Sequence, residues 1–275
     1  MTYKSILLHM ANDVGNKARL KAAADLAARF QAHVLALYVA TPVSMPAAIE
    51  GRGASYAFMA EATAIAHEKA EAIEAECADE CKARKLSCEW KVVEGDHLDL
   101  LAEEAPYADL AIVSHSKTEV LEDRLVFHVP ENLPLVVGCP VIVLPEAGFD
   151  RPIGRHVMVA WQPCAAAARA IYLSLPFLTS AEAVTICSVI NEDVAAEDPD
   201  RLAAQLARHG VKARTVVTNA ERRHVGKEIL EQAQKSGADA LVMGAYGRSR
   251  VREMVLGGVT RYVSEEAKIP LIVSH

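Results

Sequence analysis

Residues 238–243 read ADALVM, and this stretch decides the fold because residues 108–113, in the first half of the chain, read ADLAIV. A second pair of phrases, CPVIV at 139–143 and IPLIV at 269–273, repeats at the same offset. Two matching phrases at one offset indicate the duplication of a whole domain.

Short runs rich in Val, Ile and Leu alternate with stretches of helical periodicity through both halves, as is typical of buried parallel strands and their crossover helices. The runs lie near residues 5–10, 33–39, 88–93, 110–114, 140–144, 156–161, 184–190, 213–217, 240–243 and 270–274. We predict an α/β protein of two tandem domains, 1–150 and 151–275, joined by a Pro- and Gly-containing linker. Each domain is expected to hold a five-stranded, mostly parallel sheet with helices on both faces.

Bulk composition supports a folded protein and excludes some partners. The chain has 275 residues, of which 52% are hydrophobic and 24% charged, as in an ordinary globular protein with room for two domains. Its net charge of -7 offers no basic face for a nucleic acid. No apolar run approaches the ~20 residues that span a bilayer, and no signal peptide pattern is present, so we expect a cytoplasmic location and no membrane contact.

A glycine-rich stretch follows the fourth strand of the second half. It reads GAYGRSR at 244–250 and GGVT at 257–260. Glycines let backbone N–H groups approach an anion, and a helix N-terminus after them adds further N–H donors. Because α/β sheets bind ligands at the carboxyl ends of their strands, we predict a phosphate-binding loop here. Taken singly, each glycine is better explained by structure, Gly244 and Gly247 by a tight turn after the strand and Gly257 by close packing, and only the two clusters together favour a phosphate site.

The spacing Gly-x-x-Gly, nine residues, Gly at Gly244, Gly247 and Gly257 resembles the universal stress protein family, and the phrases ADALVM and IPLIV also look like that family. The resemblance covers the whole chain as two tandem copies. It implies binding of ATP, with or without Mg²⁺, or of a related adenine nucleotide. The implied phosphate and ribose contacts are Gly244, Gly247, Arg248, Gly257, Gly258, Val259 and Thr260.

The same resemblance places the adenine on backbone groups near Val189 and an acidic residue after the first strand. The chain departs from the family pattern at two positions of the implied nucleotide site. Gln162 stands where the acid is expected, and Gly258 replaces a small hydroxyl residue. An amide still forms hydrogen bonds to a ribose or a base, but it carries no charge.

The first half lacks the glycines of this loop. Ser114 stands where Gly244 aligns, Phe127 brings a bulky ring to the second glycine cluster, and Pro130 removes a backbone donor. We therefore expect no nucleotide binding of the family type in the first half, although it keeps Asp13 shortly after its first strand.

Other polar residues are interpreted without a site. Cys77 and Cys81 are four residues apart in a helical stretch and share a face, so they could contribute to a metal site, but reduced, half-buried packing residues explain them without one. Five more residues fall near predicted strand ends of the first half and are read as unrelated polar residues: His9, Asp13, Asp96, His97 and His115. No metal ligand and no catalytic residue is assigned.

Three hypotheses for function follow. The first is an adenine-nucleotide-binding stress-response protein whose second half holds the ligand and whose first half is a structural partner. The second is an interaction module in which the two sheets form a pseudo-dimer, with final strands such as 270–274 pairing across it, because an unpaired strand edge seeks a partner. The third is a weak ATP hydrolase, which phosphate release dependent on Gly257 would reveal. A homo-oligomer is compatible with all three.

Overall fold

The computed structural model of this protein describes residues 2–40, 54–115, 128–192, 198–245 and 258–275, and in residues 54–67 the backbone only. The strands of the first half are β1 (Ser5–Met10), β2 (His33–Ala40), β3 (Cys88–Glu94), β4 (Leu110–Ser114) and β5 (Val141–Leu144). Those of the second half are β6 (His156–Ala160), β7 (Ala183–Ile190), β8 (Ala213–Asn219), β9 (Ala240–Gly244) and β10 (Leu271–Ser274). The predicted α/β class is confirmed.

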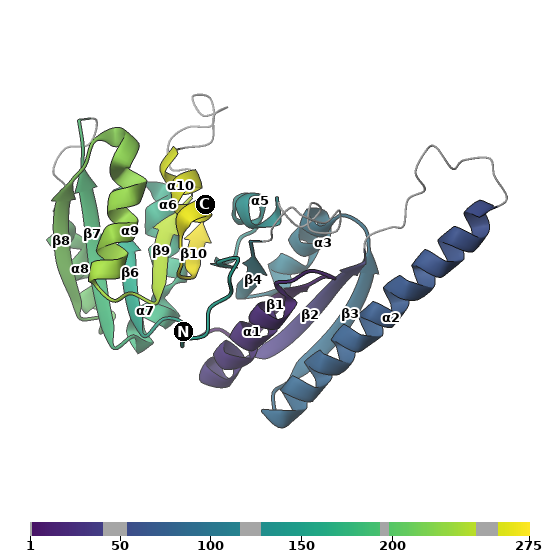
Figure 1. Ribbon diagram of the computed structural model, residues 1–275. Coiled ribbons are helices and arrows are strands. Elements are labelled where there is room, and N and C mark those ends of the chain that lie inside the picture. The colour runs from purple at the N-terminus through teal and green to yellow at the C-terminus, as the bar shows by residue number, and fades with distance from the viewer. Residues whose placement is uncertain (1, 41–53, 116–127, 193–197, 246–257) are drawn as a thin grey trace.

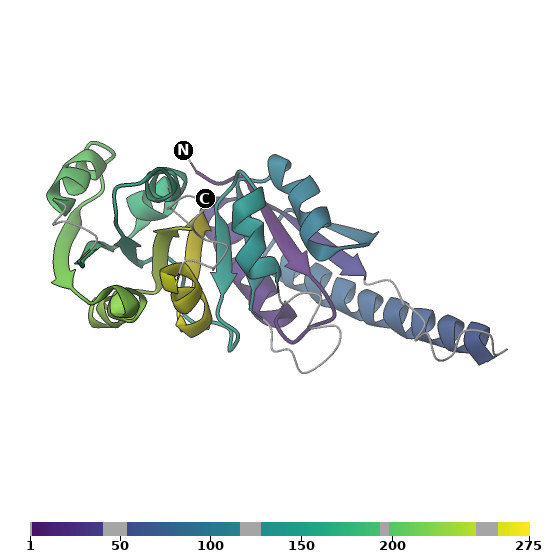
Figure 2. The ribbon, with the colours of Figure 1, turned by 90° about the horizontal axis from the view of Figure 1, so that it is seen from above.

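The strands form one sheet in the order β3-β2-β1-β4-β5-β10-β9-β6-β7-β8. Neighbours are parallel throughout, except that β5 and β10 run antiparallel with Ile142 opposite Ile272. The two halves therefore have the same internal order and meet at their last strands, as Figures 1 and 2 show. The pairing of strand 270–274 across the pseudo-dimer, expected under the second hypothesis, is confirmed within a single chain.

Helices cover both faces of this sheet. One face packs against α1 (Asn16–Phe30), α2 (Ala54–Ala83), α6 (Ala165–Leu173), α7 (Leu175–Ser180) and α8 (Pro199–Ala207). The other packs against α3 (His97–Glu104), α5 (Val129–Val136), α9 (Val225–Lys235) and α10 (Gly258–Glu266). Side chains alternate between the faces, so Ile6 and Leu8 join one core and Leu7 the other. In the described parts of the chain, none of the helices has the length and apolar character of a membrane span.

The repeated Ala-Asp pair has a structural role in both halves. The Asp239 carboxylate accepts hydrogen bonds from the amides of Gly154, Arg155 and His156, at distances of 2.7 to 3.1 Å, where β6 begins. Asp109 accepts from the amides of Lys4 and Ser5 in the equivalent place before β1. The motif that reveals the duplication thus fixes the start of the first strand in each half.

Side chains from α1 tie the two halves together beside the β5–β10 pair. Phe30 lies edge-on to both Tyr3 and Phe177, with ring centroids 5.1 and 5.2 Å apart. The Arg29 guanidinium donates to the carbonyls of Ile153, at 2.7 Å, and Gly154, at 3.1 Å. The contacts of Phe30 with Phe177 and of Arg29 with the two carbonyls cross from the first half to the second, so the halves share one continuous core on this face.

Candidate functional site

Strand pairing makes the carboxyl edges of the two halves comparable residue by residue. Ile6 of β1 lies opposite Leu110 of β4, and Val157 of β6 lies opposite Ala240 of β9. Continuing both registers along the chain sets four pairs of residues at equivalent positions: Asp13 with Cys164, Gly15 with Ala166, Arg19 with Ala170, and Ser114 with Gly244.

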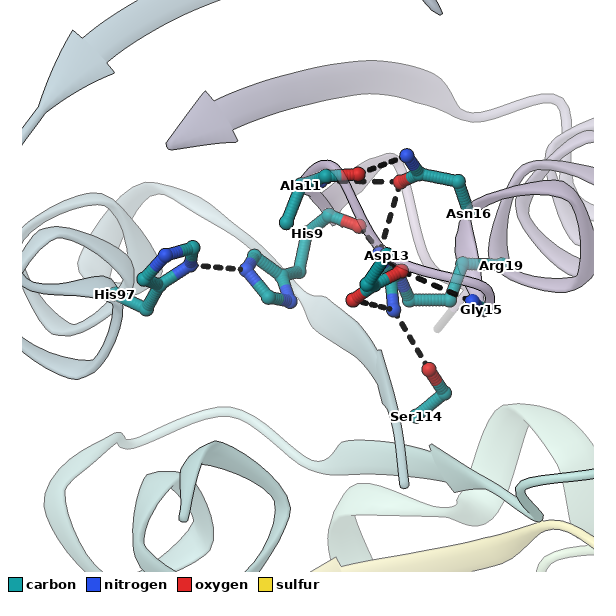
Figure 3. A network of polar contacts seen from close by, with 8 residues as sticks. All are labelled: His9, Ala11, Asp13, Gly15, Asn16, Arg19, His97 and Ser114. Atoms are coloured by element: carbon teal, nitrogen blue, oxygen red, sulfur yellow. Dashed lines mark hydrogen bonds and ion pairs between the residues drawn. The ribbon is translucent and has the colours of Figure 1, made fainter. Parts of the chain in front are cut away.

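The first edge is filled by its own side chains, with Arg19 of α1 at the centre (Figure 3). The Arg19 side chain is fully buried, and its guanidinium forms a two-pronged ion pair with Asp13 at 2.8 and 2.9 Å. The same group donates to the Ser114 hydroxyl at 2.7 Å and to the His9 carbonyl at 2.7 Å. Asn16 accepts a further bond from it at 2.8 Å.

These contacts commit Asp13 to the protein interior. Its carboxylate accepts from Arg19 on both oxygens and from the Gly15 amide at 3.0 Å. A bidentate arginine bond satisfies a buried carboxylate that would otherwise be costly to desolvate. The acidic residue that the sequence keeps after β1 is therefore an internal partner of Arg19.

The interpretation of the other polar residues as unrelated was wrong for His9 and His97, which contact each other beside the Arg19–Asp13 pair, as Figure 3 shows. His9 Nε2 lies 2.9 Å from His97 Nδ1, both rings being buried, and burial lowers the pKa of His97 to about 4 and that of His9 well below its ordinary value. Asp96 caps α3 by accepting from two backbone amides. His115 instead contacts Ser264 of α10, with Nε2 and Oγ 3.0 Å apart, and so links the first half to the second.

At the second edge, Gly244 ends β9 directly against the first turn of α6. A Cβ at this position would lie 2.5 Å from the Ala167 nitrogen and 2.6 Å from the Ala166 carbonyl carbon. These are backbone atoms, which cannot move aside cheaply. Close packing therefore requires glycine here whether or not a ligand binds, and the strand end and the α6 N-terminus lie in contact.

The backbone of Val189 faces the place where β6 stops. Ile190 accepts from Ala220 on the β8 side, and Cys187 accepts from Trp161 on the β6 side, so alternation turns both polar groups of Val189 toward β6. The next donor in that ladder would be residue 163, but Pro163 has no N–H. The Val189 carbonyl is thus directed to the carboxyl edge without a donor from β6.

The other predicted site residues divide into three groups. Gln162 is exposed at the end of β6, beside β7 and β9 in the sheet order, so the fold brings Gln162, Val189 and Gly244 to one edge. In α10, which begins at Gly258, the Val259 side chain packs against the core and Thr260 lines a small space with Pro130 and Ser264, near the junction of the halves. Gly247, Arg248 and Gly257 lie outside the described residues.

A cavity of about 590 Å³ adjoins this edge between α6 and α8, and sequence reasoning did not find it. Trp161, just after β6, stands at its wall, and the remaining lining is largely apolar with Asp198 and Arg201 at α8. Its volume is within the range of small-molecule sites. It depends on the spacing of two helices, for which no local sequence signal exists.

Comparison with known proteins settles the family. The family model described as "Universal stress protein family" matches residues 2–145 and 165–275. The chain belongs to the universal stress protein family. Both halves are matched, as the repeated register of the two sheets requires.

Solved universal stress proteins share the two-domain fold. A universal stress protein from Archaeoglobus fulgidus DSM 4304 superposes with a TM-score of 0.75 at 17% identity, over 98% of this chain and 95% of that one. A putative member from Pseudomonas aeruginosa UCBPP-PA14 gives a TM-score of 0.64 at 18% identity, over 99% and 93%. At such identities the likeness shows the fold alone.

The curated relatives match a shorter part of the chain. Universal stress protein YxiE of Bacillus subtilis (strain 168) is 37% identical over 67 residues, which are 24% of this chain and 43% of that protein. The chain thus spans less than half the length of this relative in the matched region.

Proposed function

We propose that the second half of this universal stress protein binds an adenine nucleotide, with ATP as the first ligand to test. The observation that carries the proposal is the Val189 carbonyl, which faces the carboxyl edge where Pro163 ends the β6 ladder. A backbone carbonyl that receives no donor from β6, beside the N–H of the same residue, would complement the donor and acceptor edge of an adenine base. The glycine spacing of residues 244–257 supports the same edge from the sequence side.

The residues present fit a nucleotide in the following way. Val189 would hold the base through its backbone, and the exposed amide of Gln162 would bond the ribose or the base. Backbone N–H groups of the glycine loop and of the first turn of α10 would hold the phosphates, with Arg248 as the cationic partner. Mg²⁺, when present, would neutralise phosphate charge. Binding rather than hydrolysis is proposed, and a measurement of phosphate release separates the two.

The contact between α10 and the first half offers a way for nucleotide binding to change the surface that the protein presents to a partner. α10 begins directly after the glycine loop, and its Ser264 bonds His115 of the first half. A ligand that prefers one arrangement of this segment shifts the population toward it, and with it the surface offered to a partner. A ligand with equal affinity for both arrangements would shift nothing.

The test is calorimetric titration of the full chain with ATP and Mg²⁺. Wild type is expected to bind one nucleotide, and a Gly247→Val, Gly257→Val double variant is expected to lose binding because side chains block the approach of the phosphates. Gly138→Val is the matched control, since a Cβ there meets no atom within 4 Å and the glycine lies before β5. Equal heats from wild type and the double variant, or none from wild type, would reject the proposal.

A second variant tests the base contact through the backbone. Val189→Pro removes an N–H that does not belong to the β7–β8 ladder, so the pairing with β8 should persist while nucleotide affinity falls. Circular dichroism checks that the variant keeps the fold. Phosphate release measured on the same samples separates binding from the weak hydrolase of the third hypothesis.

A further inference from the structure

Three cysteines form a cluster in the first half of the chain: Cys77 and Cys81 of α2 and Cys88 of β3. β3 is the outermost strand of the sheet on the side away from β6, β7 and β9, where the nucleotide site is proposed. Their sulfur atoms all lie within 4.8 Å of one another, and those of Cys77 and Cys88 are 3.8 Å apart. Cys77 and Cys81 are buried, whereas Cys88 is half-buried. The cluster is independent of the proposed nucleotide site because it involves different strands and helices.

Local geometry holds the three thiols together. Positions four apart on a helix share one face, which places Cys77 and Cys81 side by side toward the sheet. The chain then reverses sharply after α2: Lys85 adopts left-handed backbone with φ 55°, and the Leu86 amide bonds the Cys81 carbonyl at 2.9 Å. This turn starts β3 beside the end of the helix, so Cys88 faces the other two.

We propose that the three-cysteine cluster binds a thiophilic metal ion, with Zn²⁺ as the cation to test. Zn–S bonds are about 2.3 Å long and tetrahedral, so two thiolates on one zinc ion lie about 3.8 Å apart. The measured separation of the Cys77 and Cys88 sulfurs has this value. Thiolates select zinc and Cu⁺ over hard cations such as Mg²⁺, which prefer oxygen ligands.

Metal binding at this site must be coupled to proton release, because thiolates and not thiols are the ligands. Binding replaces three S–H protons by one Zn²⁺ and releases those protons to solvent, which leaves a single net negative charge on the site.

Three protein ligands leave a fourth position for water or an exchangeable ligand. Among the residues that the structure describes, only these three cysteines form such a group of potential metal ligands. Zinc sites with three protein ligands keep an open position, in contrast to closed structural sites with four. The half-buried Cys88 gives that position a route to solvent.

The experiment uses the full chain, reduced and stripped of metal, titrated with Zn²⁺ against a chromophoric chelator. Wild type is expected to take up one Zn²⁺ per chain. Cys88→Ser is expected to weaken binding by more than about a hundredfold, since even partners that only orient a ligand contribute roughly 10–100-fold. Cys164→Ser, which removes a half-buried thiol outside the cluster, is the matched control and should bind as wild type does.

Cobalt substitution tests for direct ligation, because a cysteine with only a structural role does not contribute to the absorption of bound Co²⁺. Co²⁺ bound by thiolates absorbs through sulfur-to-metal charge transfer, and this band should weaken in Cys77→Ser, Cys81→Ser and Cys88→Ser alike. A Cu⁺ titration of the same samples shows which thiophilic ion is preferred. The proposal would be overturned if wild type takes up no zinc, or if a folded Cys88→Ser variant binds zinc as tightly as wild type.

Discussion

At the carboxyl edge of each half, the end of a strand packs closely against the start of a helix, and the glycine that this contact requires lies on a different element in each half. In the first half the glycine stands on the helix side, at Gly15, and the side chain on the strand side, at Ser114. In the second half the strand carries Gly244 and the helix carries Ala166. Only one of the two partners has room for a side chain, so each half keeps one glycine at this contact but not on the same element.

The two carboxyl edges also differ in the polar groups that they expose to a ligand. Where the first half places a buried Arg19–Asp13 ion pair, the second half has Ala170 and Cys164. The first edge uses its polar groups internally, whereas the second leaves the backbone of Val189 directed outward. The two copies thus share the fold but differ at this edge, where the first copy holds a self-contained polar network.

The largest expected effect comes from breaking the ion pair of the first half. Arg19→Ala leaves the buried Asp13 carboxylate without its partner and should lower the free energy of unfolding by about 3–5 kcal/mol. Urea denaturation measures the loss. The double variant Asp13→Cys, Arg19→Ala, which copies the second half, should lose less than the single variant because no unpaired charge remains.

Arg84→Ala, at the surface pair with Asp25, is the matched control and should cost less than about 1 kcal/mol. A single Arg19→Ala variant as stable as this control would mean that the buried network does not hold the first edge together.

Placing the first half's residue in the second tests the glycine exchange. Gly244→Ser forces a side chain onto the α6 backbone and should cost about 1–3 kcal/mol by overpacking. The same substitution at Gly138, where a Cβ meets no atom within 4 Å, should change stability by less than about 0.5 kcal/mol. Thermal denaturation of both variants distinguishes the two sites, and equal melting temperatures would argue against a close strand-to-helix contact.

Lowering the pH should reduce the free energy of unfolding because the buried His9–His97 pair of the first half is held neutral in the folded state. Burial lowers the pKa of His97 to about 4, so the folded state keeps this ring neutral while the unfolded chain takes up a proton near pH 6.5. The stabilisation is complete above about pH 6.5 and is lost as the pH falls toward about 4. At pH 5 the loss amounts to about 2 kcal/mol.

The measurement compares urea midpoints at pH 7 and pH 5 for wild type and His97→Gln, which should show a smaller difference between the two values. His209→Gln removes an exposed histidine and should leave the wild-type difference intact. An unchanged difference in His97→Gln would contradict the assignment.

The smallest effect concerns the two aspartates of the repeated motif. Asp239 bonds three backbone amides and Asp109 bonds two, so Asp239→Ala should destabilise the protein by about 1 kcal/mol more than Asp109→Ala. Chemical denaturation of the two variants measures the difference. A larger loss for Asp109→Ala would show that the number of amide contacts does not set their relative importance.

The sequence by itself determined the elements and their duplication. Strand β1 and helix α1 fall where apolar runs and helical periodicity place them, because burial on two faces demands Val, Ile and Leu in runs of strand length. The pairing of 270–274 was also accessible, since a final strand at the edge of each sheet needs a partner. The family resemblance of the glycine loop pointed to the correct family for the whole chain.

Tertiary structure alone decided which polar residues meet. Asp13 and Ser114 are far apart in the sequence, and no local pattern indicates that Arg19 lies buried between them. Cys88 joins Cys77 and Cys81 only because a left-handed turn brings β3 against α2. Periodicity reports which face of an element is buried, whereas contacts between distant side chains depend on strand order and helix placement, which the sequence encodes only through the complete fold.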